Sequence, residues 1–173
     1  MNNTNIAPDR SGPGSAGLLV SILLRFPEVG SVTFDPDNHS LRFTLLVRGR
    51  LESTGYEQLL ELLDSSVRAF GVLQGADPRL LGVERTSFGQ VTAIEFTRDV
   101  ETLTREEIAM LIELARDGFG ERLVVEADGA LVEEDLLVQE QLIDAALDDL
   151  RDARGQQNLI AYREGGRVMV FNK

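Results

Sequence analysis

The chain has 173 residues, 43% of them hydrophobic, and a formal net charge of −12 at pH 7. This length predicts one domain with a substantial core, while the negative charge argues against binding nucleic acid through phosphates and disfavours an anionic membrane surface. There is no cysteine, and Lys173 and His39 are the only lysine and histidine. The sequence therefore excludes disulfides, thiolate nucleophiles, iron–sulfur clusters, two-histidine metal motifs and a P-loop lysine.

The chain shows no signal for a membrane or for secretion. Its most apolar run, 17–24, is far shorter than the roughly 20 residues that a membrane-spanning helix needs. One arginine precedes this run and no small-residue cleavage site follows it, which argues against a signal peptide. We therefore expect a cytoplasmic protein. The strong preference for arginine over lysine favours a bacterial source with a GC-rich genome.

The first half of the chain predicts a tail, a helix, a hairpin and a second helix. Residues 1–14 are rich in Asn, Pro, Gly and Ser and predict a disordered tail, and 15–25 predicts an apolar helix. Alternating apolar and polar residues on both sides of the Asp-Pro-Asp-Asn turn, 35–38, predict a hairpin. Thr54 and Glu57 then predict a capping box at the start of the next helix.

The second half continues this alternation. Two runs, 80–86 and 90–98, predict another hairpin, and Thr104 with Glu107 predicts a second capping box. The elements expected after that helix are a strand over 123–127, a turn at Asp128-Gly129, an acidic helix that includes 133–152, and a last hairpin closed by Gly165-Gly166.

The resulting order, α-ββ-α-ββ-α-β-α-ββ, predicts an α+β fold with a mixed or antiparallel sheet and helices mainly on one face. Its helix–hairpin alternation is similar to that of ferredoxin-like folds, an architectural likeness that carries no functional motif. We expect three parts: the disordered tail 1–14, an α+β core domain 15–130, and a C-terminal unit 131–173. This unit, the acidic helix plus the hairpin, packs on the core or lies at a dimer interface.

The acidic helix is the strongest functional signal. On a helical wheel its apolar stripe contains Val132, Leu136, Ile143, Leu147 and Leu150. On the neighbouring face, acidic residues repeat at i, i+4: Glu140, Asp144, Asp148 and Asp152. Like charges at this spacing repel by a few tenths of a kcal/mol per pair, and only Arg151 and Arg154 are close enough along the helix to relieve the repulsion. The row is a solvated face, a surface that docks a basic partner, or part of a cation site completed by another element.

His39 and its neighbours form a second candidate. His39 follows Asp35, Asp37 and Asn38 in the first hairpin turn, and a carboxylate beside a histidine is the arrangement of a general base. The same oxygen-bearing side chains suit calcium, but the spacing of an EF-hand is missing. The simpler interpretation is ordinary turn chemistry in an exposed loop. No nucleophile, cofactor motif or metal motif accompanies it.

The last hairpin is apolar on both faces. A two-residue turn at Gly165-Gly166 sets Ile160 opposite Phe171, and Tyr162 opposite Met169. The other face carries Leu159, Ala161, Val168 and Val170. A hairpin of this kind needs cover on both sides, either by insertion into the core or by a homodimer contact through an edge strand.

Three functions remain open on these grounds. The first is a non-enzymatic interaction or regulatory protein that acts as a dimer and docks a basic partner on its acidic face. The second is a small-ligand-binding module with its ligand between helix and sheet. The third is an enzyme that uses carboxylates with a divalent cation. The first is favoured, with no cofactor, no metal, no nucleic acid and no membrane as partners.

Overall fold

A computed structural model describes residues 14–126, 132–152 and 157–173. Apart from Gly14, the predicted tail lies outside the described residues, as does the Asp128-Gly129 turn. The described helices are α1 (Ser15–Arg25), α2 (Ser53–Gln74), α3 (Arg105–Phe119), the 3-10 turn η1 (Gly120–Arg122) and α4 (Glu133–Asp152). The described strands are β1 (Val29–Asp35), β2 (Ser40–Arg48), β3 (Leu81–Phe88), β4 (Val91–Asp99), β5 (Leu159–Glu164) and β6 (Arg167–Asn172).

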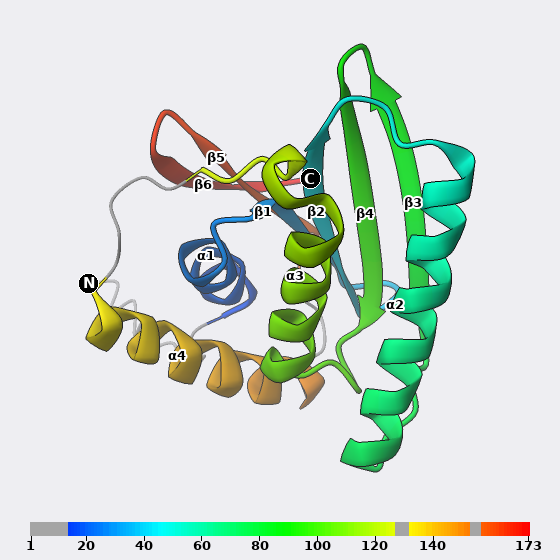
Figure 1. Cartoon of the computed structure of the whole chain (residues 1–173). Coiled ribbons are helices and arrows are strands. Elements are labelled where there is room, and N and C mark those ends of the chain that lie inside the picture. Colours follow the sequence, from blue (N-terminus) through cyan, green and yellow to red (C-terminus); the bar gives the residue numbers. More distant parts are fainter. Residues whose placement is uncertain (1–13, 127–131, 153–156) are drawn as a thin grey trace, which may run out of the picture.

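The six strands form one sheet in the order β3-β4-β2-β1-β5-β6, and every neighbouring pair is antiparallel. Helices α1, α2 and α3 lie on one face of this sheet (Figure 1). The predicted α+β class and the predicted one-sided helical layer are therefore confirmed. Among the residues that the structure describes, no helix has both the length and the apolar character needed to cross a bilayer.

The core lies between the sheet and the helices because each strand turns its apolar side chains toward them. Residues directly opposite one another on antiparallel strands point to the same face. One such row crosses the whole sheet and consists of Val83, Phe96, Phe43, Val32, Ala161 and Val170. Helix α1 adds the buried residues Leu18, Leu19, Ile22 and Leu23. A single hydrophobic cluster results, and it includes residues from α1 through β5.

The C-terminal hairpin is inserted into this sheet. Strand β5 pairs with β1, and Leu159 and Ala161 are buried in the core. Val168 and Val170 on β6 pack against the same core while remaining partly exposed. The predicted register is confirmed, since Ile160 lies opposite Phe171 and Tyr162 opposite Met169, and both turn glycines have positive φ.

Three local predictions need correction. Helix α2 begins at Ser53 with no side-chain cap, so the Thr54–Glu57 capping box is wrong. Thr104 does cap α3, accepting a hydrogen bond from the Glu107 amide at 3.2 Å, but the Glu107 carboxylate turns inward to Arg98. The predicted strand over 123–127 is, in its described part, only an isolated bridge between Leu123 and Val47. Strand β1 already pairs with β2 from Val29 onward, which leaves only the end of β2 for this segment.

Candidate functional site

Helix α4 lies across α1 and beside α3, away from the sheet (Figure 1). Its C-terminal half supplies the contact: Ile143, Ala146, Leu147 and Leu150 are all buried. The predicted apolar stripe is thus correct in this half. It is wrong at Val132, which is 62% exposed, because the start of the helix extends beyond the helices that cover the rest.

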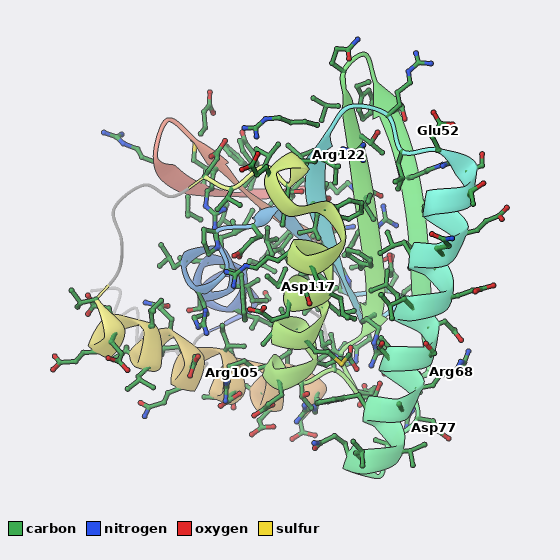
Figure 2. All side chains as sticks on the ribbon, viewed as in Figure 1. Glu52, Arg68, Asp77, Arg105, Asp117 and Arg122 are labelled. Atoms are coloured by element: carbon green, nitrogen blue, oxygen red, sulfur yellow. The ribbon has the colours of Figure 1, made fainter. Side chains whose placement is uncertain are left out.

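The first two members of the acidic row are neutralised inside the molecule. Glu140 accepts a hydrogen bond from Arg25 of α1 at 2.9 Å and lies 3.5 Å from Arg105 of α3. Arg105 also donates to Asp144 at 3.0 Å. Figure 2 shows Arg105 between α3 and α4, where its side chain is mostly buried. Burial alone would lower the pKa of Arg105, but the hydrogen bond and charge of Asp144 raise it.

These ion pairs explain why the acidic row is tolerated. The helical wheel identifies only neighbours on the same helix, Arg151 and Arg154, as counterions. Arg154 lies outside the described residues. Arg25 and Arg105 are far away in sequence, and no local pattern points to them.

The second half of the acidic row is more open. Asp148 is paired with Arg151 one turn later, but the Asp148 side chain is still 72% exposed. Arg151 in turn donates to the Leu103 carbonyl at 2.9 Å, so it fixes α4 to the start of α3. Asp152, the last residue of the helix, is also exposed.

The side of α4 that faces away from the core combines acidic and apolar residues. We call this surface the α4 outer face, and its exposed members are Glu134, Leu137, Val138, Leu142, Asp148, Asp149 and Asp152. Leu137 is 54% exposed and Val138 50% exposed, and Leu142 lies one turn after Val138. Sequence reasoning identified the acids of this face but missed the apolar residues, because they fall outside the buried stripe.

His39 does not occupy the position of a general base. Its Nδ1 lies 2.6 Å from a Glu101 carboxylate oxygen, and its Nε2 lies 2.7 Å from the carbonyl oxygen of Leu150. Both ring nitrogens thus face acceptors, and neither is free to take a proton from a substrate. The expected partners, Asp35 and Asp37, are replaced by Glu101, and the side chain is only 15% exposed rather than lying in an open loop. His39 therefore joins the first hairpin turn to the end of α4.

Asp35 stabilises its own turn and is not part of a cation site. The Asp35 carboxylate accepts hydrogen bonds from the Asp37 amide at 2.9 Å and from the Asn38 side chain at 2.7 Å. The Asn38 hydrogen bond lowers the pKa of Asp35 despite a small opposing effect of burial. With its oxygens already occupied by donors, this carboxylate is not arranged for calcium. Within the described part of the chain, no group of three His, Asp or Glu residues could hold a metal ion.

A buried ion cluster at Arg98 is the most polar part of the interior. The Arg98 side chain is 1% exposed, and its guanidinium binds Glu107 of α3 through two hydrogen bonds of 2.7 and 2.8 Å. It also donates to Asp99 and to the Leu80 carbonyl. Asp99 accepts further hydrogen bonds from backbone amides, including that of Leu80 at 2.9 Å. The cluster is enclosed and internally satisfied, so it holds α3 against the sheet rather than facing a substrate.

A cavity of about 210 Å³ lies beside the α1–β1 connection. Pro27, Leu46 and Val124 form its apolar wall, and Glu28 and Arg163 also line it. Glu28 is 2% exposed and paired with Arg116, while Arg163 donates to backbone carbonyls of this connection, including that of Val29 at 2.6 Å. The cavity is smaller than the roughly 300–1,000 Å³ of typical ligand pockets.

These features define an acidic α+β protein with a one-sided antiparallel sheet and an amphipathic helix that leaves a mixed acidic and apolar face uncovered. Comparisons of the chain with protein-family models, with curated proteins and with solved structures give no match.

Proposed function

We propose that this chain is a non-enzymatic interaction protein of the bacterial cytoplasm that binds a basic partner protein through the α4 outer face. Helix α4 carries eight acidic residues and one arginine over 133–152, a net charge of −7. This is more than half of the −12 carried by the whole chain. Glu140 and Asp144 are paired with Arg25 and Arg105, but the exposed acids of the α4 outer face keep it acidic. An acidic surface attracts basic partners and speeds their association.

The observation that carries the proposal is the exposed apolar group within this acidic surface. Leu137 and Val138 are about half exposed although the opposite side of the same helix is fully packed. A helix face that only interacts with water gains nothing from these side chains, whereas protein interfaces combine an apolar centre with a polar rim. The partner segment that fits is an amphipathic one with apolar residues flanked by arginine or lysine.

The ion pairs refine which acids bind. Glu140 and Asp144 hold α4 to α1 and α3, so their first role is internal. Asp148 and Asp152, with Asp149 between them, are the acids that a partner reaches most directly. A row of carboxylates that had to hold a metal would need converging ligands, and the described residues around α4 supply arginines instead.

The test is affinity capture from the source cells followed by binding measurements with the purified partner. The variant replaces Asp148, Asp149 and Asp152 with Asn. This change removes acids that oppose the helix dipole, so it should not weaken folding. The matched control replaces three exposed acids of α2, Glu57 and Glu61 with Gln and Asp64 with Asn. Asp64 is paired with Arg68 much as Asp148 is paired with Arg151.

We expect the partner to bind the wild type and the α2 control equally and the α4 variant at least tenfold more weakly. Binding should also weaken as salt is raised, because exposed charges are screened. A second variant, Leu137→Gln with Val138→Gln, should weaken binding by a similar factor at low and at high salt, because it leaves the acids in place. Equal binding by the wild type and both α4 variants would refute the proposal.

Small-ligand binding is a second candidate because of the cavity beside Pro27, which is lined in part by the polar residues Ser31 and Thr44. Its volume fits only a molecule of a few heavy atoms. A metabolite that raised the melting temperature of the wild type, but not of a Leu46→Phe variant, would favour this function. No shift with either protein would leave protein binding as the function.

A further inference from the structure

The sheet has two edges, β3 and β6, and they differ in how they are protected. Exposed edge strands pair with other strands unless charges, prolines or bulges prevent it. Strand β3 carries Glu84 and Arg85 at its centre. The centre of β6, 168–171, reads Val-Met-Val-Phe and has no charge, no proline and no glycine. The β6 edge is therefore the one that lacks a barrier to pairing.

Strand β6 is also apolar on both faces. Val168 and Val170 turn toward the core and are only partly buried. Met169 and Phe171 turn to the open face of the sheet, where Phe171 is 44% exposed. The Phe171 ring stacks on Tyr162 of β5, with centroids 5.6 Å apart. A strand added beside β6 would cover apolar residues on both of its faces.

The backbone of β6 offers a regular set of hydrogen-bonding groups. In a hairpin with a two-residue turn, the pair that closes the turn is hydrogen-bonded, and here this pair is Glu164 and Arg167. Residues alternate along the strand, so Arg167, Met169 and Phe171 bond inward to β5. Val168, Val170 and Asn172 therefore direct their amide and carbonyl groups outward, at the end of the sheet.

We propose that β6 pairs antiparallel with β6 of a second copy of this chain around a two-fold axis, which joins two sheets into one of twelve strands. A two-fold contact uses the same surface on both copies. The second copy presents a strand that is apolar on both faces, and it extends the helical layer as well as the sheet. This inference rests on the hairpin and is independent of the partner-binding role of α4.

The charge distribution favours a second copy at this edge. Residues 157–173 contain three basic residues and one acidic residue, a net charge of +2 in a chain of −12. Helix α1 contacts both α4 and β6 and lies between them. Pairing at β6 thus brings together the least acidic parts of two strongly acidic molecules and keeps the two α4 helices apart. Most other contacts between two copies would bring acidic surfaces together.

The pleat restricts the register of this pairing. Both open faces must lie on the same side, so residues of the same parity lie opposite one another. Val170 can then lie opposite Val170 of the second copy, which sets Met169 beside Phe171 across the axis. Alternatively, Met169 lies opposite Met169 of the second copy. Both registers place one residue opposite itself at a Cα separation of about 4.5–5.5 Å, which suits a disulfide.

The first experiment measures molar mass by light scattering during gel filtration, at protein concentrations from about 1 to 100 μM. The second measures cross-linking through single cysteines. The wild type has no cysteine, so each variant reports one position. Val170→Cys and Met169→Cys test the two registers. Thr86→Cys and Ser87→Cys are the controls, because these residues hold equivalent places on the β3 edge. A charge test compares Met169→Lys with Thr86→Lys, both on the open face.

The expected result is a mass of about twice 19.1 kDa. One of the two β6 cysteines should form a covalent dimer, and neither β3 control should. Met169→Lys should reduce dimerisation at least tenfold, while Thr86→Lys should leave it unchanged; circular dichroism checks that both variants are folded. A monomer at 100 μM would overturn the proposal, as would a dimer that persists in folded Met169→Lys or that cross-links only through β3.

Discussion

Replacing Arg98 with Met should cost about 3–5 kcal/mol of the free energy of unfolding. The substitution keeps much of the side-chain volume but removes the cation that pairs with two carboxylates, those of Glu107 and Asp99. The Glu107 side chain is 2% exposed and the Asp99 side chain 6% exposed, so water cannot replace the lost partner. Removing one member of a buried ion pair typically costs this much, because the remaining charge is left uncompensated.

The loss is large compared with a total stability of about 5–15 kcal/mol for a typical domain. Urea denaturation monitored by circular dichroism measures the lost free energy of unfolding. An unchanged m-value shows that the variant and the wild type expose the same surface on unfolding. The control is Arg68→Met on α2, which breaks the pair with Asp64, a pair that is more than half exposed. This change should cost less than about 1 kcal/mol, since exposed ion pairs contribute little.

The companion variant replaces both Arg98 and Glu107, with Met and Leu. It should recover part of the stability lost in Arg98→Met, because it removes one of the two stranded carboxylates together with the cation. Asp99 keeps its amide donors at Arg79 and Leu80 in both variants. If Arg98→Met costs less than 1 kcal/mol, or no more than Arg68→Met does, the interpretation of this cluster as the polar anchor of α3 is wrong.

Three further predictions concern acid, backbone and α4. Burial alone would raise the pKa of Asp99, but backbone and Thr hydrogen bonds and the Arg98 charge lower it below 3.8. This carboxylate therefore stabilises the fold above that pH, and the effect fades as the pH falls through the lower pKa of the folded state. Asp99→Asn should flatten the loss of stability below about pH 4 in urea titrations, and a loss as steep as that of the wild type would contradict this. Gly71→Ala should destabilise the fold by about 1–3 kcal/mol because the added Cβ would lie 2.7 Å from a backbone oxygen. Gly118→Ala, whose Cβ would have no neighbour within 4 Å, should stabilise the fold by about 0.5–1 kcal/mol. Thermal denaturation measures both effects, and a rise in melting temperature for both variants would show that the close contact at Gly71 is absent. His39→Ala removes two hydrogen bonds and should lower the free energy of unfolding by about 1–3 kcal/mol. It should also speed amide hydrogen exchange at the end of α4, and unchanged exchange there would show that His39 does not hold the helix.

The regular part of the fold follows directly from the sequence. Period-two alternation marked both arms of the first hairpin, and Gly165-Gly166 determined the register of the last one, because a two-residue turn leaves only one pairing. The Thr104 cap could be recognised from the pair Thr104 and Glu107, three positions apart in the chain. In each case the signal and the structure involve neighbours in sequence.

What sequence reasoning missed depends on contacts between distant residues. Glu107 fits a capping box locally, yet its carboxylate binds Arg98 because the fold places a buried guanidinium beside it. Glu140 looked like part of a free acidic row, but Arg25 lies 115 residues earlier and reaches it only after α1 and α4 pack. The interpretation of His39 failed for the same reason: its partners are Glu101 and the end of α4, not the acids of its own turn.

The same limit applies to the candidate site. The acids of α4 were visible as a pattern, while the exposure of Leu137 and Val138 depends on the described elements leaving the α4 outer face uncovered. A wheel places these residues beside the acids but does not show whether another element covers them. Only the packed structure distinguishes the acids that form ion pairs with other helices from the acids that are exposed.

The most direct test of the proposed function is isothermal titration of the captured partner with the wild type and with the Asp148, Asp149 and Asp152 triple Asn variant, each at low and high salt. We expect the partner to bind the wild type with an affinity that falls steeply as salt rises, and to bind the triple variant at least tenfold more weakly with little salt dependence. The same affinity for both proteins, at both salt concentrations, would contradict it.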